Sequence, residues 1–177
     1  MKPLFINIYG GPGSGKSTAM AYIFSKLKMK GVNVDMVMEF AKEVLYQGNL
    51  ESLKNQIYIF GNQYQRFFNV ARNVDVVVTD APIFMSIVYN SLTTGREEFD
   101  ALVNELGKRY RDKNYFLERV TPYSTDGRHQ NEEQANDVSR TIIEKLKKYD
   151  INYEVTNSLA ENLDKIVDEV VEMLKNK

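Results

Sequence analysis

The chain has 177 residues and a formal net charge of −1, with 43% hydrophobic and 27% charged residues. This composition is typical of one globular domain with a sizeable core, and the near-zero charge excludes a global field that would attract nucleic acid. Because there are no cysteines, disulfides and thiolate zinc sites are excluded. No apolar run has the length of a membrane span and no signal peptide precedes the first strand, so we expect a cytoplasmic protein without a membrane partner.

The first predicted elements are a buried strand and an amphipathic helix, joined by a glycine-rich loop. Residues 4–9 are apolar and rich in aromatic and branched side chains, and residues 16–30 carry apolar side chains at helical spacing. The loop matches G-x-x-x-x-G-K-[ST] through Gly10, Gly15, Lys16 and Ser17. Backbone N–H groups of such a loop point at nucleotide phosphates, and the helix N-terminus adds partial positive charge. The motif therefore predicts a site for a nucleoside triphosphate, which we expect to be ATP with Mg²⁺.

Side chains of this loop have separate predicted roles. Lys16 is expected to reach the β- and γ-phosphates, and Ser17 is expected to ligate Mg²⁺. The predicted nucleotide-binding residues are Gly11, Gly13, Ser14, Gly15, Lys16, Ser17 and Thr18. The alternative is a glycine-rich turn that matches the motif by chance, and the flanking strand and helix favour the nucleotide site.

A second strand and a short helix follow. Residues 32–38 alternate as a strand does and end at Glu39, which places this carboxylate at the carboxyl edge of the sheet. Residues 40–46 predict a short helix, and residues 47–49 break it.

Residues 50–73 predict a longer helix with polar side chains beside its buried face. The expected buried face consists of Leu53, Ile57, Phe60, Tyr64, Phe67 and Ala71. The neighbouring stripe carries Gln56, Gln63 and Arg66 together with Ile59. Two interpretations are open: a partly exposed helix edge, or a substrate wall whose amides and guanidinium read a base edge or hold an anion.

Residues 74–80 form a β-branched run that ends in an acid, Asp80. Such a run predicts a central parallel strand that is buried on both faces. An Asp at the carboxyl end of this strand stands where open α/β sheets bind ligands, and in P-loop proteins it holds Mg²⁺. The alternative is a strand-ending Asp in a turn, and the P-loop favours the magnesium role.

The rest of the chain continues the alternation of helices and strands. Helices are expected at residues 83–92, 96–109 and 131–148, strands at 115–118 and 151–156, and a final helix after Asn157 or Ser158. The longest run of turn-forming residues lies between Arg119 and Gln130. The pattern predicts the α/β class: a three-layer P-loop NTPase fold with a five-stranded, mainly parallel sheet. We expect one domain over residues 1–177, with a short lid at 120–131.

Three classes of triphosphate-binding protein are considered as explanations of this pattern. A GTPase switch should carry an internal Asn/Thr-Lys-x-Asp, and none is present. A remodelling ATPase of the AAA type usually has an additional helical lid domain, for which the chain is short. A small kinase needs a P-loop, a magnesium acid, an acceptor pocket and a mobile cationic loop, all of which are predicted here. The rival that stays open is a nucleotide-gated binding module without an acceptor.

The order of these motifs resembles that of the nucleoside and nucleoside-monophosphate kinases. Residues 39–43, Glu-Phe-Ala-Lys-Glu, are similar to the Glu-Tyr-Ala-Arg-Glu of ribosylnicotinamide-kinase-type P-loop domains. Residues 126–128, Asp-Gly-Arg, are similar to the Asp-Gly-Leu-Arg of their lid. Residues 50–66 and 79–82 resemble a branch of small bacteriophage kinases, some of which phosphorylate 5-hydroxymethyluracil in phage DNA.

The resemblance implies a kinase that transfers the γ-phosphoryl group of ATP to a hydroxyl of a nucleoside, a nucleotide or a modified DNA base, in the host cytoplasm if the protein is phage-encoded. It implies that Glu39 is the acceptor base or orienter, with Asp80 as the competitor; a capping or ion-paired Glu39 is the alternative. It also implies that Arg128 in the lid contributes charge to the transition state, with Arg119 and Arg140 as alternatives. The predicted acceptor contacts are Glu39, Gln56, Gln63, Arg66 and Arg119.

Three further features have two interpretations each. His129 is either a phosphate donor or a solvated lid residue. The basic residues between positions 108 and 119 are either a polynucleotide track or solvated charges. The aromatic residues considered for stacking on a base are Tyr58, Tyr123 and Phe84.

Overall fold

The computed structural model describes residues 2–93, 95–123 and 131–175. The strands are β1 (Leu4–Tyr9), β2 (Val34–Val37), β3 (Val76–Thr79), β4 (Arg111–Glu118) and β5 (Glu154–Asn157). The helices are α1 (Lys16–Met29), α2 (Phe40–Tyr46), α3 (Leu50–Lys54), α4 (Gln56–Ala71), α5 (Met85–Ser91), α6 (Glu97–Gly107), α7 (Glu132–Lys148) and α8 (Ala160–Lys175). The predicted bounds of the short helix at 40–46 are confirmed.

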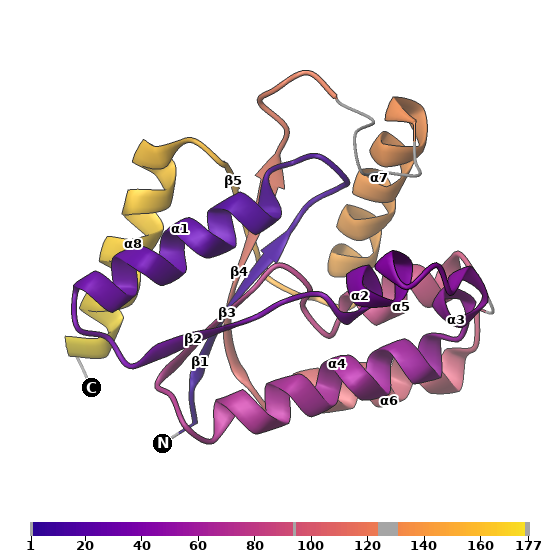
Figure 1. Ribbon diagram of the computed structural model, residues 1–177, viewed down its shortest axis with the longest axis horizontal. Helices are drawn as coiled ribbons and strands as arrows, with labels where there is room; N and C mark the ends of the chain where they lie inside the picture. The colour runs from indigo at the N-terminus through magenta and orange to yellow at the C-terminus, as the bar shows by residue number, and fades with distance from the viewer. Residues whose placement is uncertain (1, 94, 124–130, 176–177) are drawn as a thin grey trace.

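The strands form one sheet in the order β2-β3-β1-β4-β5, and every neighbouring pair is parallel. The continuous apolar side chains of β1 and β3 are buried, as expected for central strands that are covered on both faces. In a parallel sheet all carboxyl ends lie at one edge. The loops after β1, β2 and β3 therefore meet at the same edge, which is where open α/β sheets bind ligands (Figure 1).

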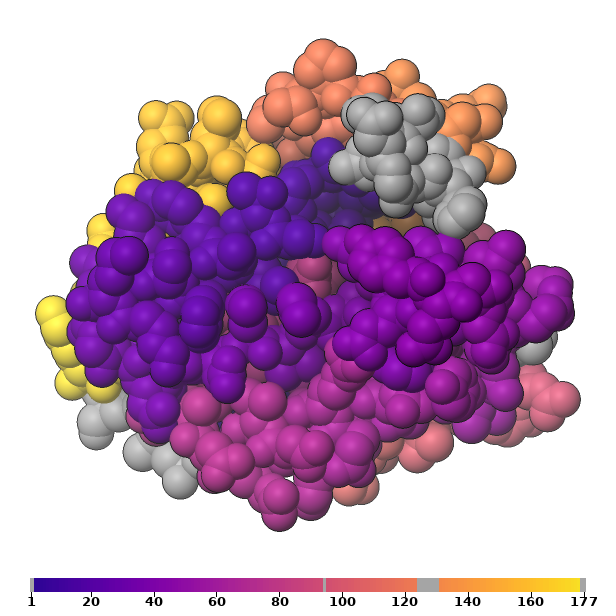
Figure 2. Space-filling view, viewed as in Figure 1, coloured from indigo at the N-terminus to yellow at the C-terminus, as the bar shows by residue number. Residues whose placement is uncertain are grey.

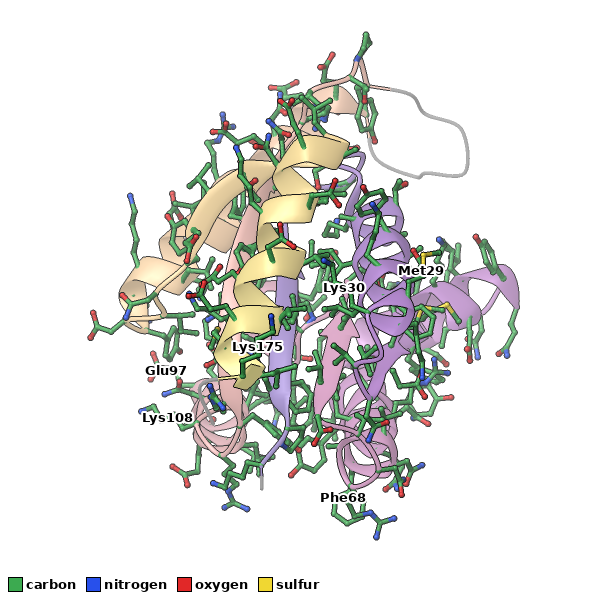
Figure 3. All side chains as sticks on the ribbon, turned by 90° about the vertical axis from the view of Figure 1, so that its left-hand side faces the viewer. Met29, Lys30, Phe68, Glu97, Lys108 and Lys175 are labelled. Carbon is green, nitrogen blue, oxygen red and sulfur yellow. The ribbon has the colours of Figure 1, made fainter. Side chains whose placement is uncertain are left out.

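Helices cover both faces of the sheet and make three layers (Figure 1). On one face α1 and α8 lie side by side and bury Ile23, Leu27 and Ile166 against the strands (Figure 3). Ion pairs between Lys26 and Asp164 and between Lys30 and Asp168 join these two helices at the surface. The other face is covered by α4, α5, α6 and α7. The prediction of a three-layer α/β fold with a five-stranded sheet is confirmed, and the sheet is wholly rather than mainly parallel.

The prediction of one helix over residues 50–73 is wrong, because the chain breaks at Asn55. This residue has non-helical backbone angles, and its side-chain oxygen accepts a hydrogen bond from the Tyr58 N–H at 3.2 Å, so it caps the start of α4. The expected buried position Ile57 is 66% exposed, while Gln56 and Gln63 of the polar stripe are buried. The interpretation of Gln56 and Gln63 as part of a partly exposed helix edge is therefore excluded.

Two strand boundaries also differ from the prediction. The fourth strand begins at Arg111 rather than at residue 115, because residues 111–114 pair with Leu4–Asn7 of the central strand β1. The last strand begins at Glu154 rather than at residue 151. None of the described helices is long and apolar enough to cross a membrane.

Candidate functional site

The loop after β1 is shaped by glycines in the left-handed region of backbone space. Gly10 has φ +147°, and a Cβ there would lie 2.8 Å from the Leu117 carbonyl oxygen. Gly15 has φ +86°, and a Cβ there would lie 2.7 Å from the Ser158 Cβ. Any larger residue would be strained and would collide at both positions. The loop therefore folds tightly before α1, with the N-terminus of that helix directed at the carboxyl edge (Figure 1).

Lys16, Ser17 and Asp80 meet at this edge. The Lys16 Nζ donates to the carbonyl oxygens of Gly10 at 2.8 Å and Gly11 at 3.1 Å, so the ammonium lies over the loop. The Ser17 hydroxyl donates to Asp80 Oδ2 at 2.7 Å. The other oxygen, Asp80 Oδ1, is buried and accepts no hydrogen bond from any residue that the structure describes.

This donor set fits a magnesium ion. Mg²⁺ prefers hard oxygen ligands and keeps several waters, so one hydroxyl and one carboxylate beside a phosphate site suffice. A buried carboxylate oxygen without a partner is costly unless a cation or water satisfies it. The residues predicted for Mg²⁺, Ser17 and Asp80, are thus in direct contact, and their arrangement suits the predicted role.

Thr79 fixes the position of Asp80 and was not singled out by the sequence. Its hydroxyl donates to the Val37 carbonyl oxygen of β2 at 2.8 Å and accepts from the Ala81 N–H at 3.1 Å. These two bonds lock the turn that follows β3. The signal in the sequence that could have identified Thr79 is its position directly before Asp80, at the end of a β-branched run.

Glu39 lies at the N-cap position of α2, but its side chain makes no capping hydrogen bond. The capping alternative is therefore wrong, and no ion pair of Glu39 is present among the described residues. Burial raises the pKa of this carboxyl; the charge of Lys16 lowers it and that of Asp80 raises it further. Burial also raises the pKa of Tyr89, and the Glu39 charge adds to that effect. Glu39 directly precedes α2, which lies beside the segment of the P-loop on the face shown in Figure 2.

Replacing Glu39 by Gln is expected to stabilise the metal-free protein at neutral pH. Because burial raises the folded-state pKa above the unfolded value, ionisation of Glu39 penalises the folded state. The penalty is absent below the unfolded pKa and grows as the pH rises towards the folded pKa. Melting temperatures in EDTA should therefore be higher for Glu39→Gln than for wild type at neutral pH, and equal at acid pH. Equal melting temperatures at both pH values would contradict the burial of this carboxyl.

Gln63 ties together the carboxyl ends of β2 and β3. Its Oε1 accepts from the Phe40 N–H at 2.8 Å, and its Nε2 donates to the carbonyl oxygens of Met38 and Ala81, both at 3.3 Å. Both amide hydrogens are thus used by the backbone on either side of Glu39 and Asp80. The predicted contact with substrate stays a prediction, and the structure gives Gln63 a positioning role.

Replacing Gln63 by Leu is expected to lower the free energy of unfolding by about 2–4 kcal/mol, because the volume is kept while buried N–H and C=O groups lose their partners. The exposed neighbour Gln65 bonds only to Asn69 at 2.9 Å among the described residues. Gln65→Leu is therefore the matched control and should change stability by less than about 0.5 kcal/mol. Urea unfolding measures both values. Equal, small effects would contradict the positioning role.

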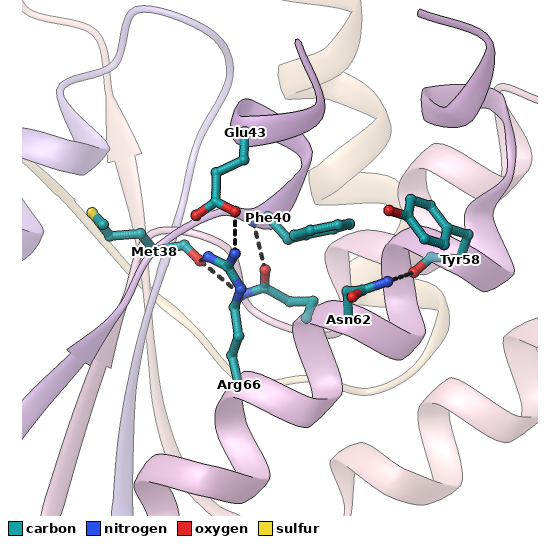
Figure 4. A network of polar contacts seen from close by, with 7 residues as sticks. Met38, Phe40, Glu43, Tyr58, Asn62 and Arg66 are labelled. Atoms are coloured by element: carbon teal, nitrogen blue, oxygen red, sulfur yellow. Dashed lines mark hydrogen bonds and ion pairs between the residues drawn. The ribbon is translucent and has the colours of Figure 1, made fainter. Parts of the chain in front are cut away.

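Arg66 and Gln56 also make internal contacts. The Arg66 guanidinium pairs with Glu43, reaches the Met38 carbonyl oxygen at 3.5 Å, and lies 5.0 Å from the centre of the Phe40 ring (Figure 4). The Gln56 Nε2 donates to the Leu53 carbonyl oxygen at 2.8 Å, while its Oε1 is buried without a partner in the described chain. Arg66 thus holds α2 against α4.

Arg119 follows β4 and contacts the P-loop. Its guanidinium donates to the Pro12 carbonyl oxygen at 3.3 Å, pairs with Glu132 at 3.3 Å and lies 4.8 Å from the centre of the Tyr123 ring. The other alternative to the predicted lid arginine, Arg140, is exposed and pairs with Asp137. Of these two, Arg119 is the one beside the phosphate loop.

Part of the predicted lid cannot be placed. Arg128 and His129 lie outside the residues that the structure describes. Asn131, which follows them, is the N-cap of α7: its side chain accepts from the Gln134 N–H, and the Gln134 side chain accepts from the Asn131 N–H, both at 2.9 Å. This reciprocal pair of hydrogen bonds caps α7, which begins at Glu132, one residue after the expected start at 131.

Comparison with known proteins decides the family. A protein-family model described as an AAA domain matches residues 5–162. The chain belongs to this AAA-domain family. The match covers the P-loop, the acidic strand ends and the region of the lid, so the whole candidate site lies within the AAA domain. No curated protein matches the chain by sequence.

Solved structures show what fold this AAA domain has. Thymidylate kinase from Ehrlichia chaffeensis is similar with a TM-score of 0.64 and 17% identity, over 96% of this chain and 99% of that chain. The NadR protein in complex with NR is similar with a TM-score of 0.72 and 16% identity, over 94% of this chain and 51% of that chain. The chain thus spans about half of NadR. The AAA domain thus has a fold similar to that of thymidylate kinase and of NadR.

The helix α7 of the AAA domain packs closely on the phosphate loop, which the sequence did not predict. A Cβ at Gly11 would lie 2.7 Å from the Ala135 carbonyl oxygen and against the Ser139 hydroxyl. Only glycine fits this approach. The signal available in the sequence was the pair of adjacent glycines at positions 10 and 11.

The aromatic residues considered for base stacking lie in different surroundings. Phe84 is buried in the core, with its ring centre 5.5 Å from that of Tyr149. Tyr123 lies under the Arg119 guanidinium. Tyr58 is exposed and contacts Phe40 edge to face, with 5.5 Å between ring centres. Of these three side chains, Phe84 is excluded as a ring that could stack at the surface.

Proposed function

We propose that the protein is an ATP-dependent kinase that transfers the γ-phosphoryl group to a hydroxyl of a nucleoside- or nucleotide-type acceptor, with 5-hydroxymethyluracil in DNA as one candidate. The observation that carries the proposal is Glu39. Its carboxylate lies at the carboxyl edge of the sheet and caps no helix. The charges of Lys16 and Asp80 both act on the pKa of this group. A protein that only binds nucleotide has no need of a second acid there.

The residues of the P-loop would hold the phosphoryl donor. The Lys16 ammonium lies over the loop carbonyl oxygens, and it would bind the β- and γ-phosphates there. Ser17 and Asp80 would hold Mg²⁺, which neutralises charge on the phosphates when bound. The backbone N–H groups of the loop and the first turn of α1 would bind the remaining phosphate oxygens.

Glu39 would act on the acceptor. As the acceptor oxygen forms its bond to the γ-phosphorus, the bond from that phosphorus to the β,γ-bridging oxygen breaks and ADP leaves. The proton of the acceptor hydroxyl passes to the Glu39 carboxylate. The pKa of this group is raised by burial, which makes it a stronger base than an ordinary glutamate. Arg119, beside Pro12, and Arg128 of the lid would add positive charge around the moving group.

The proposed acceptor class rests on the resemblance and on the comparisons. Both similar solved structures bear names that concern a nucleotide or a complex with NR: a thymidylate kinase and NadR. On α4, the buried Gln56 carries an oxygen without a partner in the described chain, and Tyr58, two positions further on, exposes its ring. An N–H donor and a ring face are what a nucleobase offers.

Labelled ATP tests the proposal. The purified protein is incubated with Mg²⁺, [γ-³²P]ATP and, in separate reactions, nucleosides, nucleotides and DNA that contains 5-hydroxymethyluracil. Transfer of label to one acceptor class is the expected result. Label that appears only as free phosphate at the same slow rate with every acceptor would favour the nucleotide-gated binding module instead.

A further inference from the structure

A cavity of about 480 Å³ lies on the face of the sheet that is covered by α4, α5, α6 and α7. This volume falls within the range of small-molecule sites. Its lining is rich in aromatic rings, which include Phe5, Tyr9, Phe67, Tyr110, Tyr149 and Tyr153. None of the residues assigned to phosphate, magnesium or acceptor lines it, so it is separate from the catalytic edge.

Polar side chains of two adjacent central strands also line this cavity. Asn7 of β1 and Asn114 of β4 are only 9% and 8% exposed. The Asn7 Nδ2 donates to Asn114 Oδ1 at 2.9 Å and to Asp112 Oδ2 at 3.5 Å, and the Asn114 Nδ2 donates to the Asn152 carbonyl oxygen at 3.0 Å. Asn is depleted in strands, and burying its amide is costly unless the amide is used. Two such residues facing a cavity are therefore unexpected in a purely structural core.

The hydrogen bonds of this cluster leave acceptor oxygens for a ligand. The amide nitrogens of Asn7 and Asn114 bond within the cluster or to backbone. Among the described residues, no donor bonds to Asn7 Oδ1. The Asp112 carboxyl accepts from the Asn7 and Asn114 amides and from its own backbone N–H, but it is exposed and keeps room for further donors. A ligand with adjacent N–H donors would match these oxygens.

We infer that this cavity is a second ligand site, which takes a planar heterocycle with adjacent N–H donors, the chemical class that includes guanine. The half-buried rings of Tyr110, Tyr149 and Tyr153 supply faces for the heterocycle, and Asp112 with Asn7 supplies acceptors for its edge. The site goes beyond the proposed phosphoryl transfer, because no catalytic residue takes part in it.

Tyr9 connects this cavity to the phosphate loop. This residue lines the cavity and directly precedes Gly10, and its ring centre is 6.5 Å from that of Phe84, which lies in the turn after Asp80. A ligand in the cavity therefore contacts both segments that carry the phosphate and magnesium residues. The site is placed to act as an effector site.

Guanosine is the probe for this inference, and it is titrated calorimetrically into the full chain with Mg²⁺ and saturating non-hydrolysable ATP analogue. Wild-type protein is expected to bind it, and inosine, which lacks the exocyclic amine, is expected to bind more weakly. Asp112→Asn should weaken guanosine binding about ten-fold or more, because a carboxylate acceptor is replaced by an amide. Asp75→Asn is the matched control, because Asp75 is exposed, directly precedes β3 and does not line this cavity; it should leave binding unchanged.

A pair of glycine variants locates the ligand. Gly107 of α6 lines the cavity, and a Cβ there would meet Ile83 Cδ1 at an ordinary 3.9 Å, so Gly107→Leu should fold and fill the space. Gly61 of α4 has no atom within 4 Å of an added Cβ, so Gly61→Leu is the control. Loss of guanosine binding in Gly107→Leu but not in Gly61→Leu, at unchanged melting temperature, is the expected result. No binding to wild type, or binding that neither Asp112→Asn nor Gly107→Leu weakens, would overturn the inference.

Discussion

Replacing Lys16 by Ala is expected to lower kcat by about 10²- to 10³-fold or more, which is the loss found when one preorganised charge donor is removed from a transition state. The physical reason is the loss of the compact cation that would hold the β- and γ-phosphates. In the structure this ammonium lies over the loop, within 3.1 Å of the carbonyl oxygens of Gly10 and Gly11, so no other described group replaces it at that place. Steady-state kinetics with the labelled acceptor gives kcat.

Lys28→Ala is the control for this variant. Lys28 stands on the same helix, is exposed, and contacts the Phe24 ring rather than the phosphate loop. It should keep wild-type kcat and melting temperature. If Lys16→Ala kept wild-type kcat with ATP, the assignment of the P-loop as the site of the phosphoryl donor would be wrong.

Replacing Glu39 by Gln is expected to lower kcat by about 10²- to 10⁴-fold, the usual contribution of a positioned general base. Gln keeps the shape of the side chain but cannot accept the acceptor proton. Binding of the ATP analogue should change little, because the P-loop residues hold the donor. The variant should be inactive yet more stable than wild type at neutral pH, a combination that a purely structural residue would not show.

Two controls separate Glu39 from its neighbours. Glu43→Gln changes the next carboxylate of α2, which pairs with Arg66, and should leave kcat within a few-fold of wild type. Asp80→Asn tests the competing base: if Asp80 acts only through Mg²⁺, its loss should raise the Mg²⁺ concentration needed for half-maximal activity. If the Glu39→Gln enzyme kept the kcat and the Mg²⁺ dependence of wild type, Glu39 would not be the general base, and Asp80 would be assigned this role.

The parts of the site that local sequence determines were predictable. Gly10 to Ser17 form a motif whose backbone shape and side-chain roles are set within eight positions of the chain. Asp80 was predictable because a β-branched run fixes the strand and the acid follows at its end. Glu39 could be placed at the edge in the same way, because the bounds of α2 follow from its pattern.

The parts that depend on contacts between distant residues were not predictable. The side chain of Gln63 is buried because it bonds to backbone 18, 23 and 25 positions away, so helical periodicity described it only as polar. Asn55 interrupts a continuous apolar pattern through a cap that periodicity does not detect. The cavity around Asn7 and Asn114 arises where β1 pairs with β4, across more than a hundred residues of sequence.

The partition of label in parallel reactions of wild type and Glu39→Gln tests the central claim most directly. Each enzyme receives [γ-³²P]ATP, Mg²⁺ and the preferred acceptor of the wild type, and phosphorylated acceptor and free phosphate are separated and counted. We predict that wild type places nearly all label on the acceptor, and that Glu39→Gln loses this transfer while still binding ATP. Label found as free phosphate alone in both reactions, at equal rates and regardless of acceptor, would contradict a kinase site built on Glu39, Lys16 and Asp80.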